Sequence, residues 1–107
     1  TEKVVYSLTE AGEKEFEKLM FEIAVKPINV FLDFNAVIVN LDELSLENQK
    51  ACITDIKQNV KVLKKDLEEN LRNKENLPEI PKMGMAVLQQ QLILAEAIEK
   101  WLDLLRS

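Results

Sequence analysis

The chain has 107 residues, 47% of them hydrophobic and 31% charged, and a formal net charge of −5 at pH 7. This length allows one domain with a core of modest size, and the composition is that of a folded protein rather than a disordered one. The negative charge argues against this piece holding a nucleic-acid backbone by itself. Because Leu, Glu, Lys, Ala and Gln dominate, we expect the all-α fold class, a helical bundle of about four helices.

The sequence contains no histidine, a single cysteine (Cys52) and no long apolar run. Without histidine, the commonest general base and the usual zinc ligand are missing. One cysteine cannot form an internal disulfide, and its presence suits a reducing compartment. No apolar run reaches the length of a membrane span. We therefore expect a cytoplasmic protein that has no membrane partner, no metal and no cofactor.

The first predicted element is a short β-strand over residues 1–8. Val4, Tyr6 and Leu8 occupy alternate positions, which is the period of a half-buried strand. No second strand follows that could pair with it. We therefore expect residues 1–8 to fray, or to pair with a neighbouring molecule through their open edge.

A helix is predicted next, over residues 10 to about 25. Thr9 is a good N-cap residue, and Glu10 and Glu13 lie where the helix dipole favours negative charge. Apolar side chains follow at helical spacing, so one face of this helix is apolar. Pro27 ends this helix or opens the next one.

Residues 28–41 are predicted to form a largely buried helix. The polar residues Asn29, Asp33 and Asn40 recur on one helical face. The segment is also rich in Val and Ile, which favour strands. A pair of strands is therefore the alternative structure for this segment.

The third helix is predicted to begin after the capping residue Ser45 and to run to about Lys74. Its heptad pattern is the clearest in the sequence, because six of the eight a and d positions are apolar: Leu46, Gln49, Ile53, Ile56, Val60, Leu63, Leu67 and Asn70. The e positions carry lysine, at Lys50, Lys57 and Lys64. Such a seam packs either inside a bundle or between two chains, and we favour the seam of a coiled-coil dimer.

A loop over Asn73–Lys82, which contains Pro78 and Pro81, leads to a last helix from Met85 to about Arg106. The apolar stripe of this helix is wider than one neighbouring helix can cover, so we expect it to pack against its own chain and against another molecule. The predicted dimer interface comprises Ile53, Ile56, Val60, Leu63, Leu67, Leu88, Leu94, Ala95, Ile98, Trp101, Leu102 and Leu105. Trp101 is also the candidate wall of an effector pocket at that interface.

No arrangement of residues indicates an enzyme. Paired carboxylates such as Glu68 and Glu69 lie on polar helix faces, where nothing shifts a carboxyl pKa. Arg72 and Arg106 are the only arginines, and no glycine-rich phosphate loop is present. The sequence therefore predicts no catalytic residues.

The two ends of the chain resemble a family of transcription regulators. The stretch YSLTEAGEKEF (Tyr6–Phe16) resembles the Y-x-L-T-x-x-G pattern at which the wing of a winged-helix DNA-binding domain passes into the next helix. The stretch AEAIEKWLDLL (Ala95–Leu105) resembles the closing W-L-x-x-L pattern of PadR-like regulators, at Trp101 and Leu102. The matching residues of the wing-to-helix junction are Tyr6, Leu8, Thr9 and Gly12.

This resemblance implies a cytoplasmic homodimer that binds operator DNA, usually as a repressor. It divides the chain into a remnant wing strand (residues 1–8), a linking helix (9–26) and a C-terminal helical dimerisation domain (27–107). Operator DNA would be held by a helix-turn-helix upstream of residue 1, which is absent here. A small-molecule effector would act on the dimerisation domain.

Two other functions are open on the sequence alone. A stand-alone helical module that binds a partner protein in an apolar groove is the main alternative. A small all-helical enzyme is the third, but its chemistry would need several cationic side chains that converge on an anionic substrate. The sequence upstream of residue 1 separates the first reading from the others, because a helix-turn-helix there indicates a regulator.

Overall fold

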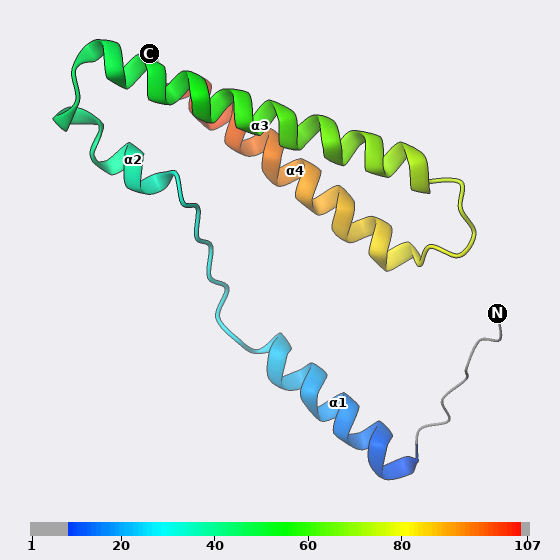
Figure 1. The fold of residues 1–107 in the computed structure, drawn as a ribbon. Coiled ribbons are helices and arrows are strands. Elements are labelled where there is room, and N and C mark those ends of the chain that lie inside the picture. Colours follow the sequence, from blue (N-terminus) through cyan, green and yellow to red (C-terminus); the bar gives the residue numbers. More distant parts are fainter. Residues whose placement is uncertain (1–8, 106–107) are drawn as a thin grey trace. The chain divides into compact units, whose positions relative to one another are not determined.

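The computed structural model describes residues 9–105, and helices are the only regular secondary structure among them (Figure 1). These are α1 (Glu10–Ala24), α2 (Asn35–Val39), the 3₁₀ turn η1 (Leu41–Glu43), α3 (Leu46–Lys74) and α4 (Lys82–Leu105). The all-α prediction is confirmed for this part of the chain. The strand predicted over residues 1–8 lies outside the described residues, and so do Tyr6 and Leu8.

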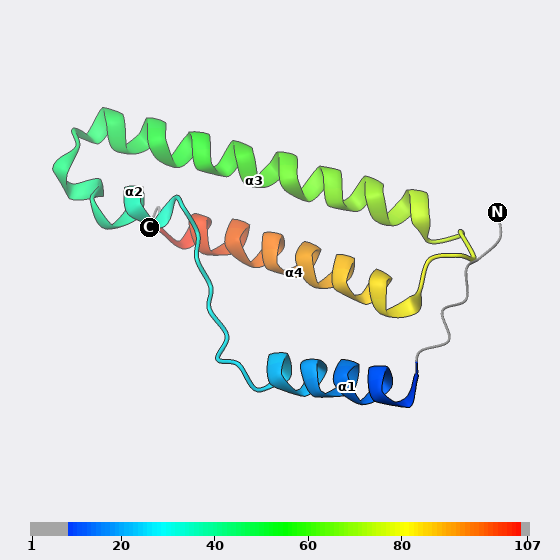
Figure 2. The same ribbon diagram turned by 60° about the horizontal axis from the view of Figure 1, so that its bottom comes forward.

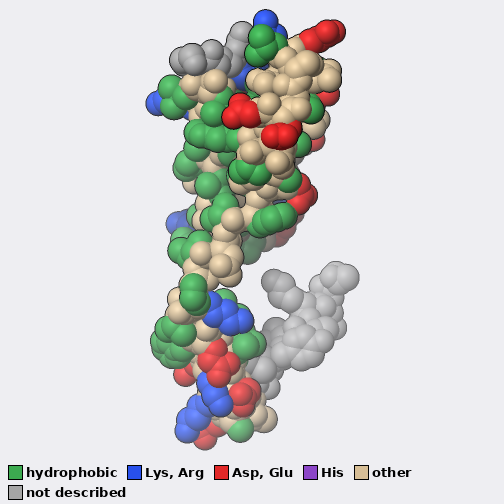
Figure 3. Space-filling view, turned by 90° about the vertical axis from the view of Figure 1, so that its left-hand side faces the viewer, with side chains coloured by type: hydrophobic (Ala, Val, Ile, Leu, Met, Phe, Trp, Pro, Cys, Tyr) green, Lys and Arg blue, Asp and Glu red, His purple; other side chains and the backbone are tan. Residues whose placement is uncertain are grey.

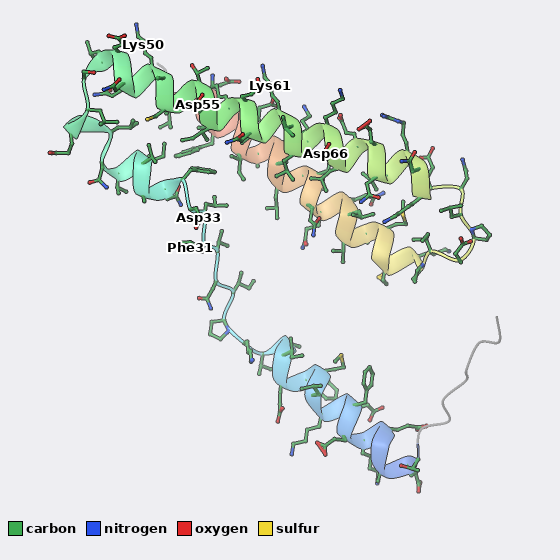
Figure 4. The ribbon with its side chains drawn as sticks, viewed as in Figure 1. Phe31, Asp33, Lys50, Asp55, Lys61 and Asp66 are labelled. Carbon is green, nitrogen blue, oxygen red and sulfur yellow. The ribbon has the colours of Figure 1, made fainter. Side chains whose placement is uncertain are left out.

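The chain divides into two compact units, the first ending at Leu32 and the second beginning at Asp33. The first unit contains α1, and the second contains α2, η1, α3 and α4. The predicted domain boundary after residue 26 stays a prediction, and the boundary between the two compact units lies after Leu32. It falls in an extended segment, where Phe31 and Asp33 are labelled in Figure 4.

Helix α1 begins as the sequence predicts. The Thr9 hydroxyl Oγ1 accepts a hydrogen bond from the backbone N–H of Gly12 at 3.0 Å, so Thr9 is the N-cap. Glu10 and Glu13 occupy the first turn, where their charges interact favourably with the helix dipole. None of the α1 side chains is buried, although its apolar residues lie on one face.

The prediction of a helix over residues 28–41 is wrong for most of the segment. Only Asn35–Val39 is α-helical, and residues 28–32 are irregular. The prediction of burial is also wrong, because Ile28 is 91% exposed and Phe31 is 83% exposed. Val, Ile and Asn, which make up much of this segment, are poor helix formers. Most of the apolar side chains of residues 28–32 are exposed rather than packed, so the low helix propensity of the segment keeps it irregular.

Helices α3 and α4 form an antiparallel hairpin, and they run side by side in both ribbon views (Figures 1 and 2). The Ser45 hydroxyl accepts a hydrogen bond from the Asn48 N–H at 3.1 Å and caps α3, as predicted. Residues 75–81 link the two helices. Helix α4 starts at Lys82, three residues earlier than predicted, because Pro81 is tolerated ahead of a first helical turn.

The core of the second unit is small. Five hydrophobic residues are buried among those described: Ile56, Val60, Leu67, Ala95 and Leu102. Ile56, Val60 and Leu102 form one cluster, against which the partly buried residues Phe34, Val37, Ile38 and Ile98 pack. Helix α2 therefore covers the cluster at the end of the hairpin where α3 begins and α4 ends. Hydrophobic side chains remain visible over much of the surface in Figure 3.

Candidate functional site

The structure separates the predicted dimer-interface residues into three groups. The hairpin itself buries Ile56, Val60, Leu67, Ala95 and Leu102. A second group is half-buried: Ile53, Leu88 and Ile98. A third group is exposed to solvent: Leu63, Leu94, Trp101 and Leu105. The heptad of α3 thus contributes to packing within the chain, and the exposed group is what remains for contact with another molecule.

One flank of the hairpin is closed by two ion pairs between α3 and α4. Lys57 Nζ donates to Asp103 Oδ1 at 2.8 Å, and Lys64 Nζ donates to Glu99 Oε1 at 3.1 Å. The hydrogen bond from Lys64 to Glu99, together with their charge attraction, raises the pKa of Lys64 above its ordinary value. Charged side chains thus fix the antiparallel register along this flank.

Two of the three lysines of the predicted e positions, Lys57 and Lys64, therefore pair across the hairpin. Acidic partners for these lysines were not named from the sequence, so Glu99 and Asp103 were not predicted. The spacings give no clear signal for this pairing, because the two lysines are seven residues apart on α3 and the two acids are four residues apart on α4. In contrast, Lys61 lies on the side of α3 that faces away from α4 (Figure 4).

On the opposite flank of the hairpin, the surface of α4 is apolar. At 100° per residue, five exposed hydrophobic residues of α4 fall within an arc of roughly 40°: Met83, Val87, Leu94, Trp101 and Leu105. We call this set the α4 stripe. Ala95 and Leu102 face α3. Around the circumference of α4 these two residues lie between the stripe on one side and the two acids of the ion pairs on the other. The same reasoning places the half-exposed Leu63 of α3 on the flank of the stripe.

Trp101 joins the α4 stripe to helix α2. The Phe34 and Trp101 rings stack with centroids 6.3 Å apart and an interplanar angle of 26°. Trp101 nevertheless remains 37% exposed. Aromatic pairs of this geometry add stability beyond the area that they bury. The partner ring was not predicted, because Phe34 lies in the segment that was assigned to a single longer helix.

A half-open cavity of about 470 Å³ lies where η1, the start of α3 and the end of α4 meet. It is lined by Leu41, Leu46, Gln49, Lys50, Ile53, Thr54, Lys57 and Leu105. Two of its polar groups are already engaged, since Lys57 pairs with Asp103 and the Gln49 amide donates to the Leu44 carbonyl at 2.9 Å. Trp101 does not line this cavity, so the predicted effector wall and this cavity are separate features.

The described residues offer no assembly for metal chemistry. No group of three or more His, Cys, Asp or Glu side chains among residues 9–105 could hold a metal ion. Within the same range, no helix is both long and apolar enough to cross a membrane. Cys52 is half-buried on α3.

The predicted wing-to-helix junction is described from Thr9 onward. Thr9 and Gly12 meet through the capping hydrogen bond, and the Thr9 carbonyl accepts a second bond from the Glu13 N–H at 2.9 Å. These two bonds satisfy backbone donors in the first turn of α1.

Comparison with known proteins gave no match: no protein-family model, no curated protein and no solved structure is similar to this chain.

Proposed function

We propose that this chain is the dimerisation domain of a PadR-like DNA-binding transcriptional regulator, and that the intact protein acts as a repressor. The observation that carries the proposal is the α4 stripe, a row of exposed hydrophobic side chains beside a core that buries few residues. A chain with so small a core needs a further apolar contact to be stable. The two sequence resemblances supply the family.

In this proposal the dimer has a geometric task. A winged-helix domain upstream of Thr9 would hold DNA in each protomer, and the dimer would set the distance between the two recognition helices. The cap of α1 at Thr9 supports the predicted position of the wing-to-helix junction, because the helix starts directly after that residue. The net charge of −5 agrees with a domain that does not itself touch phosphates.

Effector sensing is part of the same proposal. Trp101 lies in the α4 stripe and stacks on Phe34 of α2. A flat ligand that competes with Phe34 for the Trp101 ring would therefore change the surface on which two protomers meet. This contact is the route by which we expect a small molecule to alter the dimer.

The first test is sedimentation equilibrium of the 107-residue chain at micromolar concentration. We expect a dimer, and we expect Leu94→Glu to be monomeric because it places charge in an apolar contact. Val62→Glu is the matched control, since Val62 is 49% exposed on the α3 surface and Leu94 is 56% exposed on the stripe. A monomeric wild-type chain, or a dimeric Leu94→Glu chain, would contradict the proposal.

The regulator assignment needs a separate test on the intact protein. Footprinting of the intact protein on the DNA that precedes its own gene should show two protected half-sites. Their centres should lie one helical turn of DNA, or a multiple of a turn, apart. The regulator assignment is contradicted if the intact protein lacks a helix-turn-helix and protects no DNA. The chain would then be a dimerisation module of some other kind of protein.

A further inference from the structure

The spacing of the α4 stripe is symmetric under reversal of the helix. Its five members follow one another at intervals of four, seven, seven and four residues, in the order Met83, Val87, Leu94, Trp101 and Leu105. When α4 is laid antiparallel on a copy of itself with Leu94 at the centre, every member meets another member. A surface that matches its own reversed copy is what an isologous two-fold interface requires.

We infer that the partner of the α4 stripe is α4 of a second copy of this chain, antiparallel, with the two-fold axis at Leu94. This inference rests on the proposed function and names the contact that would make the dimer. It places Leu94 against the partner's Leu94, Val87 against the partner's Trp101, and Met83 against the partner's Leu105.

The side-chain sizes favour this register. Trp101, the largest side chain of the stripe, meets the smaller, branched Val87. Cores pack well when large and small side chains face one another. Sliding the helices by one turn, four residues, puts Trp101 opposite Gln91 or Met83, and Leu94 opposite Ile98 or Gln90. In either direction most of the stripe then faces residues outside it. The centred register is therefore the one that covers all five exposed side chains.

The charges favour it as well. Between Met83 and Leu105, the charged residues of α4 are Glu96, Glu99, Lys100 and Asp103. On the helical wheel all four lie outside the arc of the stripe, and Glu99 and Asp103 are paired with α3. The contact therefore buries no charge, as is usual for the centre of a homodimer interface.

An antiparallel arrangement is preferred over a parallel one for two reasons. Antiparallel helices place the positive end of one dipole beside the negative end of the other. A parallel arrangement would also set Trp101 against Trp101 and Val87 against Val87, which leaves the small pair underpacked where the large pair is crowded. The antiparallel pairing evens out these volumes.

Disulfide cross-linking of the 107-residue chain in a Cys52→Ser background tests the inference. Leu94→Cys should oxidise almost completely to a covalent dimer, because the two-fold axis brings its Cβ atoms together. Val87→Cys and Trp101→Cys should each stay monomeric on a denaturing gel and should form a mixed dimer when combined. Met83→Cys with Leu105→Cys should behave in the same way without removing the Trp101 ring. Gln89→Cys, on the polar side of α4, is the control that should not cross-link.

The outcomes separate this inference from the proposed function. If the wild-type chain sediments as a dimer but Leu94→Cys does not cross-link, the register is wrong and the dimerisation function stands. If Val87→Cys cross-links to itself, the helices are parallel and the inference is wrong. If the wild-type chain is monomeric, both the inference and the proposed function fail.

Discussion

Leu102 occupies the most enclosed position in the described part of the chain, with 0% of its surface exposed. It packs with Ile56 and Val60 of α3, and Phe34 and Ile98 border the same cluster. The sequence predicts Leu102 in the dimer interface, because periodicity shows that a residue is apolar and inward-facing but not which surface covers it. The structure places Leu102 within the hairpin.

Leu102→Ala should therefore lower the free energy of unfolding by about 2–5 kcal/mol, because it leaves a cavity in the core. Val62→Ala is the control, and it should change the value by no more than about 0.5 kcal/mol, since Val62 lies on the solvent side of α3. Urea unfolding followed by circular dichroism measures both. Protein concentration must be equal in all samples, because association contributes to the apparent stability. Equal losses in the two variants would show that Leu102 is not a core residue.

Lys64 and Glu99 illustrate how a half-exposed ion pair affects stability. Glu99 raises the pKa of Lys64 above its ordinary value of 10.5. Since the pKa is higher in the folded than in the unfolded state, the stabilisation is fully present below about pH 10.5. It disappears as the pH rises through the folded-state pKa.

Glu99→Gln should thus be less stable than the wild type by a constant amount between about pH 7 and pH 9, and this difference should shrink above about pH 10.5. Thermal unfolding across this range measures the difference. Glu79→Gln, in the exposed loop between α3 and α4, should show no such alkaline convergence. A Glu99→Gln difference that persists unchanged at high pH would mean that packing, and not the ion pair, is responsible.

At the scale of elements, capping residues mark where α1 and α3 begin. Thr9 and Ser45 each accept a hydrogen bond from the N–H three residues on, and both were recognisable in the sequence as polar residues before an apolar periodic run. The start of α3 matters more for the second unit, because α3 provides three of the buried residues.

Ser45→Ala should cost about 1 kcal/mol of unfolding free energy, because the N-terminal donors of α3 lose their acceptor. Ser45→Gly should cost only a few tenths of a kcal/mol, since glycine at an N-cap leaves those donors open to water. Urea denaturation of the two variants side by side gives the comparison. A larger loss for glycine than for alanine would argue that the hydroxyl does not act as a cap.

The elements also show where sequence reasoning reached its limit. Helices α1 and α3 had both a cap and a regular apolar period, and both were predicted within a residue of their observed ends. Residues 28–41 had apolar content without a clean period. In that segment, helix formation depended on whether a neighbouring element covered the apolar side chains. Only Asn35–Val39 forms an α-helix, which is α2.

At the scale of the whole molecule, the ratio of buried to exposed hydrophobic residues is the informative quantity. The second unit buries one large side chain completely and leaves Met83, Val87, Leu94 and Leu63 about half exposed or more. The α3–α4 hairpin of this unit has two ion pairs on one flank and the α4 stripe on the other. Burying this apolar flank against a second apolar surface would stabilise such a structure.

The sequence by itself determined the helical class, the limits of α1 and α3, and the presence of a last helix with more apolar surface than one neighbour can cover. These properties depend on local capping and on the period of the side chains, which can be read along the chain. Only the tertiary structure decided which apolar residues α3 and α4 use on each other, that Lys57 and Lys64 reach across to α4, and that Phe34 stacks on Trp101. Those contacts join residues distant in sequence, so their register depends on the whole hairpin and not on any one segment of it.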